Sequence, residues 1–478
     1  MRADEPVAVV GGGIAGLVAA YELSFRGVPF VLLEAGPRFG GVIRSERVDG
    51  FLLEAGPDTL LAQKPEALRL CREVGLEIDL VPTNPDQRTL YVVHRRRLHP
   101  LPDGMVLGVP TRLGPLARSA LFTWSGKLRM ACDLIIPARR ARGDESIASF
   151  FRRRLGTEAL ERLGGPFLAG IHAGDADRLS IQATFPRLVE MEQRHGGLIR
   201  GLLAARPRAA SPSPPMFYSL RDGLGELVEA LVTRLPSARL RTHAGVRGLV
   251  RRDGRFTLRL ESGEEVRAAA VILALPAPCA APLVGMLDEE AGRLLGEIRF
   301  ASSAAVYLGY RREHVTHPLD GYGLIVAERE GLRTSACSFF STKFPGRAPE
   351  GHVLLRGFVG GARDAGVLAA DDRELIDRVH GEMAPLLGLR AAPVLTRVYR
   401  WPLATPQMEV GHLERVAALE RRLEALPGLV LTGAGLRGTG IPDTIADARR
   451  MTAAAVGSVP GSPAAARPAA GSQSVAGR

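Results

Sequence analysis

The sequence predicts a mixed α/β and α+β fold, with a Rossmann-like dinucleotide-binding domain, a mixed-sheet domain and a helical subdomain. Three observations predict it. Two short apolar runs near the N-terminus flank a helix-forming stretch, which together make a unit of about thirty residues. An arginine- and leucine-rich region comes later, followed by short β-branched runs spaced by turn residues. A second glycine-rich segment lies near the C-terminal end, so that glycine-rich segments frame the chain.

The first βαβ unit can be assigned element by element. Val7–Val10 is a buried strand that enters a glycine turn, because it is apolar, β-branched and short. Ile14–Arg26 has helix-forming composition and ends at Gly27, a suitable C-cap. Pro29–Glu34 is the second strand.

The rest of the chain is expected to pass repeatedly between domains. We expect one strand over Val266–Leu275, helices near 371–388 and 411–425, and a last strand over Leu429–Leu431. The expected segments are a dinucleotide-binding domain (1–75, 211–285 and 396–456), a substrate domain (76–93 and 286–395), a helical subdomain (94–210) and a disordered, Pro/Ala/Ser/Gly-rich tail (457–478).

The net charge of +11 suggests a nucleic-acid partner at first sight. However, the 62 Lys and Arg residues are spread along the whole chain, and no helix-turn-helix, RRM or zinc-finger pattern accompanies them. We therefore expect no nucleic-acid partner; a basic balance also suits an anionic substrate or membrane surface. Over Pro110–Arg142, basic and apolar residues alternate, which fits either an ordinary amphipathic subdomain or a face for a membrane or partner.

The chain carries no recognisable targeting or metal-binding pattern. No charged region followed by an apolar run precedes the first strand, so no signal peptide is expected. The longest uncharged run, Ala268–Leu287, contains three prolines, which argues against a membrane-spanning helix. The four cysteines lack metal-ligand spacing, so we expect free thiols and no metal site. A cytoplasmic protein follows, with peripheral contact at the inner face of the cell membrane and a homodimer left open.

The segment Gly11–Gly16 (GGGIAG) fits the GxGxxG pattern between a strand and a helix. In this pattern the glycines permit the tight turn, the approach of a pyrophosphate and close helix–strand packing, while the helix N-terminus faces the phosphate charge. Glu34 ends the next strand and can accept hydrogen bonds from a ribose. The expected pyrophosphate contacts are Gly11, Gly13, Ile14, Ala15 and Gly16.

The string that follows Glu34 favours FAD. It reads E-A-x-x-R-x-G-G and resembles that of the flavin amine oxidase superfamily, as does the later stretch Leu431–Asp443. The resemblance implies an FAD-binding domain of the amine-oxidase type, in which a late helix N-terminus points toward the flavin ring. It implies contacts to FAD from Ala35, Arg38, Gly40, Gly41, Val42, Arg44, Gly435, Gly440, Ile441 and Pro442.

A second dinucleotide site is not expected. Gly433, Gly435 and Gly438 also fit GxGxxG, but too little chain follows for a further βαβ unit with its ribose carboxylate. Without a nicotinamide domain, a reduced flavin would be reoxidised by dioxygen or another acceptor.

Further strings, in their order and spacing, resemble signatures of the protoporphyrinogen/coproporphyrinogen oxidase family. They include Glu54–Thr59 (EAGPDT), Arg97–Pro102 (RLHPLP), Ala169–Asp175 (AGIHAGD), Phe358–Gly361 (FVGG) and Arg400-Trp401. The resemblance covers nearly the whole chain up to the tail. The run Thr111–Ala138 looks most like the soluble type of Gram-positive bacteria, whose members favour coproporphyrinogen III.

This resemblance implies further site residues. Val246 would contact the adenine side and Trp401 would lie against the flavin, joined in the FAD site by Gly56, Pro57, Asp58 and Thr59. The substrate would lie near Lys64, Gly170, Ile325, Ser338 and Phe358. Ser338 departs from the bulky apolar residue of better-studied members.

A propionate-binding residue is not fixed by the resemblance. Many members carry an arginine where this chain has Leu90, so Arg88, Lys64 or one of Arg95–Arg97 would have to bind that group. A run such as Arg95–Arg97 is, however, more often a solvated turn.

The resemblance implies removal of six hydrogens from a porphyrinogen in haem biosynthesis, with hydride transfer to flavin N5 and release of hydrogen peroxide from dioxygen. No catalytic side chain is assigned, because the sequence offers no Ser-His-Asp set, metal cluster or carboxylate pair. Coproporphyrinogen III is slightly preferred over protoporphyrinogen IX. The alternatives are another enzyme of the superfamily, an amine oxidase or carotenoid desaturase, and more remotely a non-catalytic, basic FAD-containing binding protein.

Overall fold

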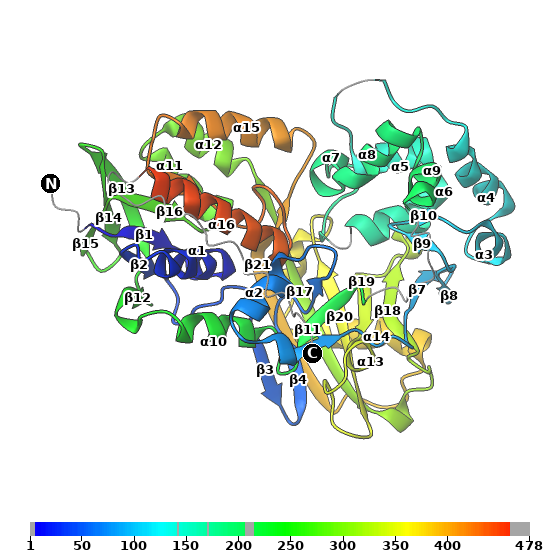
Figure 1. Cartoon of the computed structure of the whole chain (residues 1–478). Coiled ribbons are helices and arrows are strands. Elements are labelled where there is room, and N and C mark those ends of the chain that lie inside the picture. Colours follow the sequence, from blue (N-terminus) through cyan, green and yellow to red (C-terminus); the bar gives the residue numbers. More distant parts are fainter. Residues whose placement is uncertain (1–4, 141–142, 170–171, 206–214, 459–478) are drawn as a thin grey trace, which may run out of the picture.

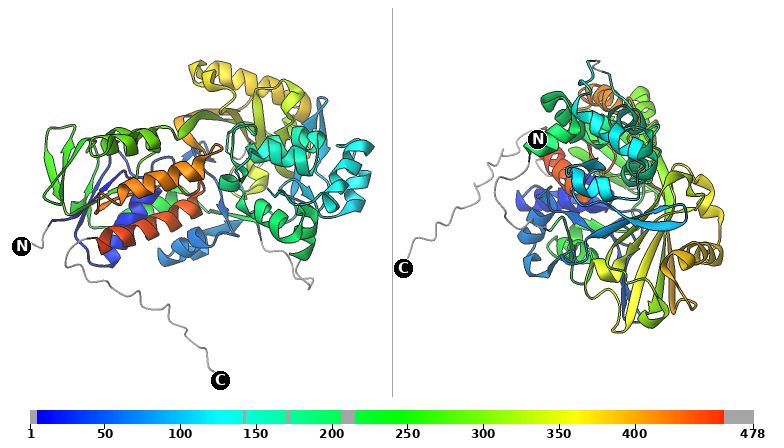
Figure 2. Two further views of the ribbon diagram at one scale, coloured as in Figure 1. Left: turned by 90° about the horizontal axis from the view of Figure 1, so that it is seen from above. Right: turned by 90° about the vertical axis from the view of Figure 1, so that its right-hand side faces the viewer.

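The computed structural model describes residues 5–140, 143–169, 172–205 and 215–458, which form three packed regions (Figure 1). A parallel sheet with its helices contains both the first and the last described elements. A mixed sheet and a helical region make up the rest. In the left view of Figure 2, the helical region (cyan) and the small sheet over residues 246–268 (green) lie at opposite ends of the molecule. Gly170 and nearly all of the expected tail lie outside the described residues.

The parallel sheet has five strands, and its strands come from distant parts of the chain. In spatial order they are β12 (Leu240–Arg241), β2 (Phe30–Leu33), β1 (Val7–Val10), β16 (Ala270–Leu273) and β22 (Leu429–Leu431). Their nearly continuous apolar sequences fit a sheet that is covered on both faces. Helix α1 (Ile14–Phe25) packs against α16 (Ile441–Gly457) on one face (Figure 1).

Further elements complete this region. On the face of α1 and α16 the core also takes in α2 (Glu66–Glu73) and α10 (Gly225–Thr233). The other face is covered by β13 (Val246–Arg252), β14 (Arg255–Leu260), β15 (Glu265–Ala268), α11 (Ala277–Gly285), α12 (Glu289–Gly296) and α15 (His412–Leu423). Because α12 packs on α11 and α15, it groups with this region and not with the mixed sheet.

The mixed sheet has seven strands, all antiparallel neighbours except β18 and β7. Their order is β21 (Leu395–Gln407), β17 (Arg299–Arg311), β20 (His352–Gly360), β19 (Thr334–Phe339), β18 (Gly321–Val326), β7 (Thr89–His94) and β8 (Arg97–Pro100). Helix α14 (Asp372–Leu387) covers one face through a core that includes Val379 and Met383. The other face contributes to the cores shared with the helical region and with the hairpin over residues 45–54.

The helical region is built around a buried ion pair. Arg154 and Asp133 are both fully buried, and Arg154 Nε donates to Asp133 Oδ1 at 2.6 Å. The elements are α3 (Leu113–Arg118), α4 (Trp124–Ala131), α5 (Ile147–Arg154), α6 (Thr157–Ala159), the π-helical segment η3 (Leu160–Ala169), α7 (Ile181–Thr184), α8 (Pro186–His195) and α9 (Leu198–Ala204).

Short elements link the three regions. The strands are β3 (Ser45–Val48), β4 (Phe51–Glu54), β5 (Leu60–Leu61), β6 (Leu80–Pro82), β9 (Met105–Val106), β10 (Val109–Pro110) and β11 (Phe217–Leu220); the single turns are α13 (Phe340–Lys343), η1 (Glu77–Asp79), η2 (Cys132–Leu134), η4 (Ser237–Arg239), η5 (Arg312–His314), η6 (Glu328–Glu330) and η7 (Ala365–Ala369).

Most of the expected elements are found, with one clear correction. The helices α14 and α15 and the strand β22 confirm the expectations at 371–388, 411–425 and 429–431. The single strand expected over Val266–Leu275 is wrong: β15 pairs antiparallel with β14, whereas β16 pairs parallel with β1 in another sheet. Apolar continuity cannot reveal this change of sheet, because it depends on partners far away in the chain. Among the described helices, none combines the length and apolar character that crossing a membrane requires.

Candidate active site

The turn between β1 and α1 leaves an open space in front of the helix. Gly11 has φ +102°, and a Cβ on Gly16 would lie 1.8 Å from the Gly11 carbonyl oxygen, so both positions require glycine. At Gly13 an added Cβ would meet nothing within 4 Å. No side chain caps α1, and its first turn holds no acidic residue. The free N–H groups therefore face a space that suits a phosphate.

Glu34 stands at the end of β2, next to this turn. Its two carboxylate oxygens accept hydrogen bonds from the N–H groups of Gly12 at 2.6 Å and Gly36 at 2.7 Å. Its carbonyl accepts from the Ala244 N–H at 2.8 Å. The chain that leads into β13, and so to Val246, therefore runs beside Glu34, as one end of a dinucleotide site requires.

The loop after Glu34 folds back onto the glycine turn. The Gly40 N–H donates to the Gly12 carbonyl at 2.7 Å. Arg38 donates to the carbonyls of Gly41 at 2.6 Å and Ile43 at 3.2 Å, and burial followed by the charge of Arg44 lowers its pKa. Arg38 thus orders the loop through its hydrogen bonds to these backbone oxygens.

The loop that carries Gly56, Pro57, Asp58 and Thr59 packs directly on the preceding one. A Cβ on Gly56 would lie 2.0 Å from the carbonyl oxygen of Val42, which is half-exposed. Trp401 Nε1 donates to the Ala55 carbonyl at 2.6 Å. The tryptophan of the mixed sheet is thereby fixed against this loop.

Two cationic side chains, those of Lys343 and Arg356, bind the same loop. Asp58 Oδ2 lies 3.0 Å from Lys343 Nζ and 3.9 Å from Arg356, and Arg356 also donates to the Gly56 carbonyl at 2.5 Å. Burial acts to raise the pKa of Asp58, but the two cations outweigh it and lower the pKa below its usual value. Neither Lys343 nor Arg356 was expected at this site, since nothing in the neighbouring sequence marks either cation as buried or paired.

The C-terminal glycine segment opens a second helix toward the same place. The Gly435 N–H donates to the Gly438 carbonyl at 2.7 Å, and Gly440 is the N-cap of α16, followed by Ile441 and Pro442. No side chain caps α16. Since α1 follows β1 and α16 follows β22 in one parallel sheet, both helices begin at the carboxyl edge of that sheet.

The three strand residues predicted for the substrate share one face of the mixed sheet. Ile325 pairs with Ala336, which pairs in turn with Phe358, and Ser338 lies in the neighbouring row beside Arg356. Paired residues point to the same side of a sheet. These three residues therefore lie on the face of the mixed sheet opposite the one that α14 covers.

The basic residues considered for a propionate are dispersed. Lys64 Nζ lies 2.6 Å from a carboxylate oxygen of Asp443, in the first turn of α16, and is half-exposed. Arg88 is exposed at the start of β7. Arg95 and Arg96 have φ of +52° and +57° in the exposed turn between β7 and β8, and their N–H groups donate to Glu330. Among these basic residues, Lys64 contacts the glycine-rich segment that is predicted to bind the cofactor. Arg95–Arg97 form a solvated turn.

Residues 14–456 match the model of the family described as flavin containing amine oxidoreductase. The chain belongs to this family. It is 37% identical to a coproporphyrinogen III oxidase of Bacillus subtilis (strain 168), covering 92% of this chain and 95% of the relative. It is 35% identical to the coproporphyrinogen III oxidase of Propionibacterium freudenreichii subsp. freudenreichii, covering 92% and 89%. The crystal structure of an Exiguobacterium sp. 255-15 protein described as "Putative protoporphyrinogen oxidase" superposes with a TM-score of 0.83 at 31% identity, covering 94% of this chain and 98% of that protein.

These findings confirm the expected family and its fold, and with them a flavin-dependent oxidoreductase. A flavin nucleotide also fits the residues present: the space at Gly13 is open, two uncapped helices begin at one sheet edge, and Glu34 stands at the far end of that edge. When bound, the flavin supplies the hydride-accepting chemistry.

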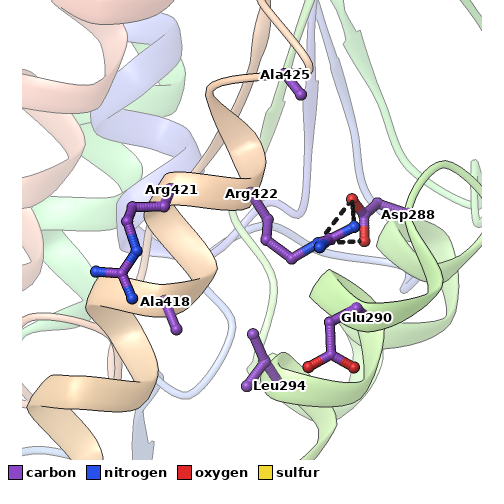
Figure 3. A pocket seen from close by; sticks show the side chains of 7 residues that line it. All are labelled: Asp288, Glu290, Leu294, Ala418, Arg421, Arg422 and Ala425. Carbon is purple, nitrogen blue, oxygen red and sulfur yellow. Dashed lines mark hydrogen bonds and ion pairs between the residues drawn. The ribbon is translucent and has the colours of Figure 1, made fainter.

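A separate cavity of about 440 Å³ lies between α12 and α15 (Figure 3). Its charged lining includes Arg422, whose guanidinium lies 2.8 Å from Asp288, and Glu290, which pairs with Arg293 at 2.7 Å. Asp288 and Glu290 are thus each paired with an arginine, and none of the predicted site residues lines the cavity. We assign it no part in the flavin site.

Proposed function

We propose that this protein is an FAD-dependent oxidase that converts a porphyrinogen to a porphyrin in haem biosynthesis, with dioxygen as acceptor and hydrogen peroxide as by-product. The observation that carries the proposal is its 37% identity, over nearly the full length of both chains, to a coproporphyrinogen III oxidase. The two relatives described above bear the same name, which favours coproporphyrinogen III over protoporphyrinogen IX as the substrate.

In this proposal the chain binds and orients FAD along the edge of the parallel sheet. Glu34 accepts from the adenine ribose, and Val246 lies on the adenine side. The N-terminus of α1 at Gly13 faces the pyrophosphate, and that of α16 at Gly440 faces the flavin. The remaining proposed contacts are Gly11, Ile14, Ala15, Gly16, Ala35, Arg38, Gly40, Gly41, Val42, Arg44, Gly56, Pro57, Asp58, Thr59, Trp401, Gly435, Ile441 and Pro442.

The substrate would occupy the face of the mixed sheet opposite α14. Phe358, which is half-buried, offers an apolar surface to the macrocycle, and Ser338 lies in the next row. Ile325 lies in the same row as Phe358 and is buried in the core shared with the helical region, so it would support this surface from behind. Lys64 is the proposed partner of a propionate, because it is half-exposed and close to α16, although it must then share its charge with Asp443. We retain Arg88 as a second candidate, since it is exposed and has no ion-pair partner among the described residues.

Aerobic turnover of the purified holoprotein tests this function. Porphyrin fluorescence is followed with coproporphyrinogen III, with protoporphyrinogen IX and, as a control for the wider family, with a primary amine. We expect the tetrapropionate substrate to be oxidised fastest, with peroxide formed in proportion and the released cofactor running as FAD in chromatography. A flavin-loaded protein that oxidises the amine and neither porphyrinogen would contradict the proposal.

We also propose a peripheral membrane contact through α3, α4 and η2. Leu113, Trp124, Leu128 and Ile135 are 53–77% exposed there, and Lys127 Nζ lies 4.3 Å from the ring centroid of Trp124. Apolar side chains beside basic ones suit an anionic lipid surface. Co-sedimentation with anionic vesicles should fall for L128S, but not for the control M286S, which alters an exposed methionine far along the chain; equal binding would contradict this.

The remaining expectation, a homodimer, would be tested by light scattering of the purified holoprotein.

A further inference from the structure

His172 lies where the helical region, the mixed sheet and the last helix meet. Its carbonyl accepts a hydrogen bond from Gln407 Nε2 at 2.9 Å, and its ring packs edge-on against Phe185, with the ring centroids 5.6 Å apart. The carbonyl of Ala173 accepts from the Ala362 N–H at 2.8 Å, just beyond the end of β20. Three elements therefore hold the histidine in place.

The imidazole has one nitrogen engaged and one available. Nδ1 lies 3.4 Å from Thr439 Oγ1, immediately before the N-cap of α16. His172 is only 8% exposed, and Nε2 has no hydrogen-bond partner within the described part of the chain. Nε2 is not among the fully buried side-chain atoms, so, beside the proposed flavin-facing helix, it can accept a hydrogen bond from a bound ligand.

The surroundings keep this imidazole neutral. Burial lowers its pKa to about 4, Lys64 acts in the same direction, and Asp443 opposes both. These two are the charged groups that act on it, and they form an ion pair with each other. At neutral pH the ring therefore presents a lone pair, which makes it an acceptor for an N–H group.

We propose that Nε2 of His172 accepts the pyrrole proton that a porphyrinogen loses in two of its three two-electron oxidations. This inference rests on the proposed function. In each step a C–H bond of the macrocycle breaks, and its hydrogen leaves with the electron pair as hydride to the bound flavin. In two of the three steps an N–H bond also breaks; its electrons stay in the macrocycle as part of a new double bond, and the proton forms a bond to Nε2. In the remaining step the proton comes from a second C–H bond of the macrocycle, because a porphyrin keeps two of the four N–H groups. Dioxygen then takes up one hydride equivalent and that proton as hydrogen peroxide, which returns His172 to its neutral form.

The test compares H172N, which can keep a polar contact to Thr439 but lacks Nε2, with the control T439V, which keeps the imidazole. Anaerobic mixing of holoprotein with coproporphyrinogen III gives the rate of flavin reduction, and a titration with coproporphyrin gives a Kd. We expect H172N to slow flavin reduction by roughly 10²- to 10⁴-fold, with a smaller effect of T439V and little change in Kd. Added imidazole should partly restore the rate of H172A, a response that a purely structural role would not give.

Flavin content and thermal unfolding are measured for each variant, and H172Q replaces H172N if the latter does not fold. The inference is overturned if a flavin-loaded variant without the imidazole is reduced within about threefold of the wild-type rate, or if imidazole fails to rescue H172A. Failure of the wild-type protein to be reduced by any porphyrinogen would instead overturn the proposed function, so the two failures are distinguishable.

Discussion

Replacing Gly16 and Gly13 separately by alanine should divide folding from cofactor binding. A Cβ at Gly16 would lie 1.8 Å from the Gly11 carbonyl oxygen, where ordinary contact needs more than 3 Å, so α1 and the end of β1 would have to move apart. At Gly13 the added methyl meets no protein atom within 4 Å, and the φ of −71° and ψ of −176° are open to alanine. G16A should therefore destabilise the folded protein itself, whereas G13A should weaken the complex with the cofactor.

The magnitudes follow from these geometries. Overpacking costs about 1–3 kcal/mol, and a backbone contact of 1.8 Å belongs at the upper end of that range. Because alanine gains about 1 kcal/mol over glycine inside a helix, G16A should lower the free energy of unfolding of the apoprotein by about 2 kcal/mol. G13A should leave that free energy unchanged or raise it by about 0.5 kcal/mol, because alanine restricts the unfolded chain. Its methyl occupies the space proposed for the pyrophosphate, and a loss of about 1.4 kcal/mol there weakens FAD binding about tenfold.

Denaturant unfolding of the apoproteins and titration with FAD, followed by quenching of flavin fluorescence, give the two quantities independently. Wild-type affinity in G13A would refute the placement of the pyrophosphate in front of α1. Wild-type apoprotein stability in G16A would refute the close packing of α1 on the end of β1.

Three further predictions concern buried charge and the ribose end of the site. Asp133→Asn should lower the free energy of unfolding by about 3 kcal/mol, because the fully buried guanidinium of Arg154 loses its nearest counter-charge; denaturant unfolding checks this, and an unchanged midpoint would contradict it. Burial raises the pKa of Glu54 to about 7, against the opposing hydrogen bonds from Ser45 and Leu224. The folded state then binds the proton more tightly than the unfolded state, so stability should be full below about pH 4.5 and fall by a few kcal/mol up to about pH 7. Glu54→Gln should lack that slope in unfolding measured across this range, and parallel slopes would count against a buried, protonated carboxyl. Glu34→Gln should weaken FAD binding by roughly tenfold while leaving FMN binding unchanged, since only FAD carries the adenine ribose; equal losses for both flavins in titrations would exclude the ribose role.

Local sequence patterns were enough to predict the nucleotide-binding half of the fold. The glycine turn, the helix after it and Glu34 at the next strand end depend on residues within a few positions of each other. The same holds for α14, α15 and β22, which lie close to their expected bounds. Where the chain changes sheets without a change in apolar character, as between β15 and β16, the sequence pattern failed.

Local sequence patterns were not enough to predict how the residues of the substrate site come together. The resemblance named Ile325, Ser338 and Phe358, but only the register of β18, β19 and β20 puts them on one face. Arg356 and Lys343 gave no signal, since a buried arginine in a strand looks like any other arginine until Asp58 is found beside it. His172 gave no signal for the same reason, since nothing in its own loop marks it as a functional group.

The sequence by itself determined the family, the dinucleotide fold and the order of its elements, because glycine conformation, helix ends and apolar periodicity are set by near neighbours. The tertiary structure alone decided which side chains meet. Thr439 reaches His172 across 267 positions of the chain, and Lys64 reaches Asp443 across 379. Such pairs depend on how whole elements pack and register, and the free energy that brings them together is spread over the buried cores, not over the residues that meet.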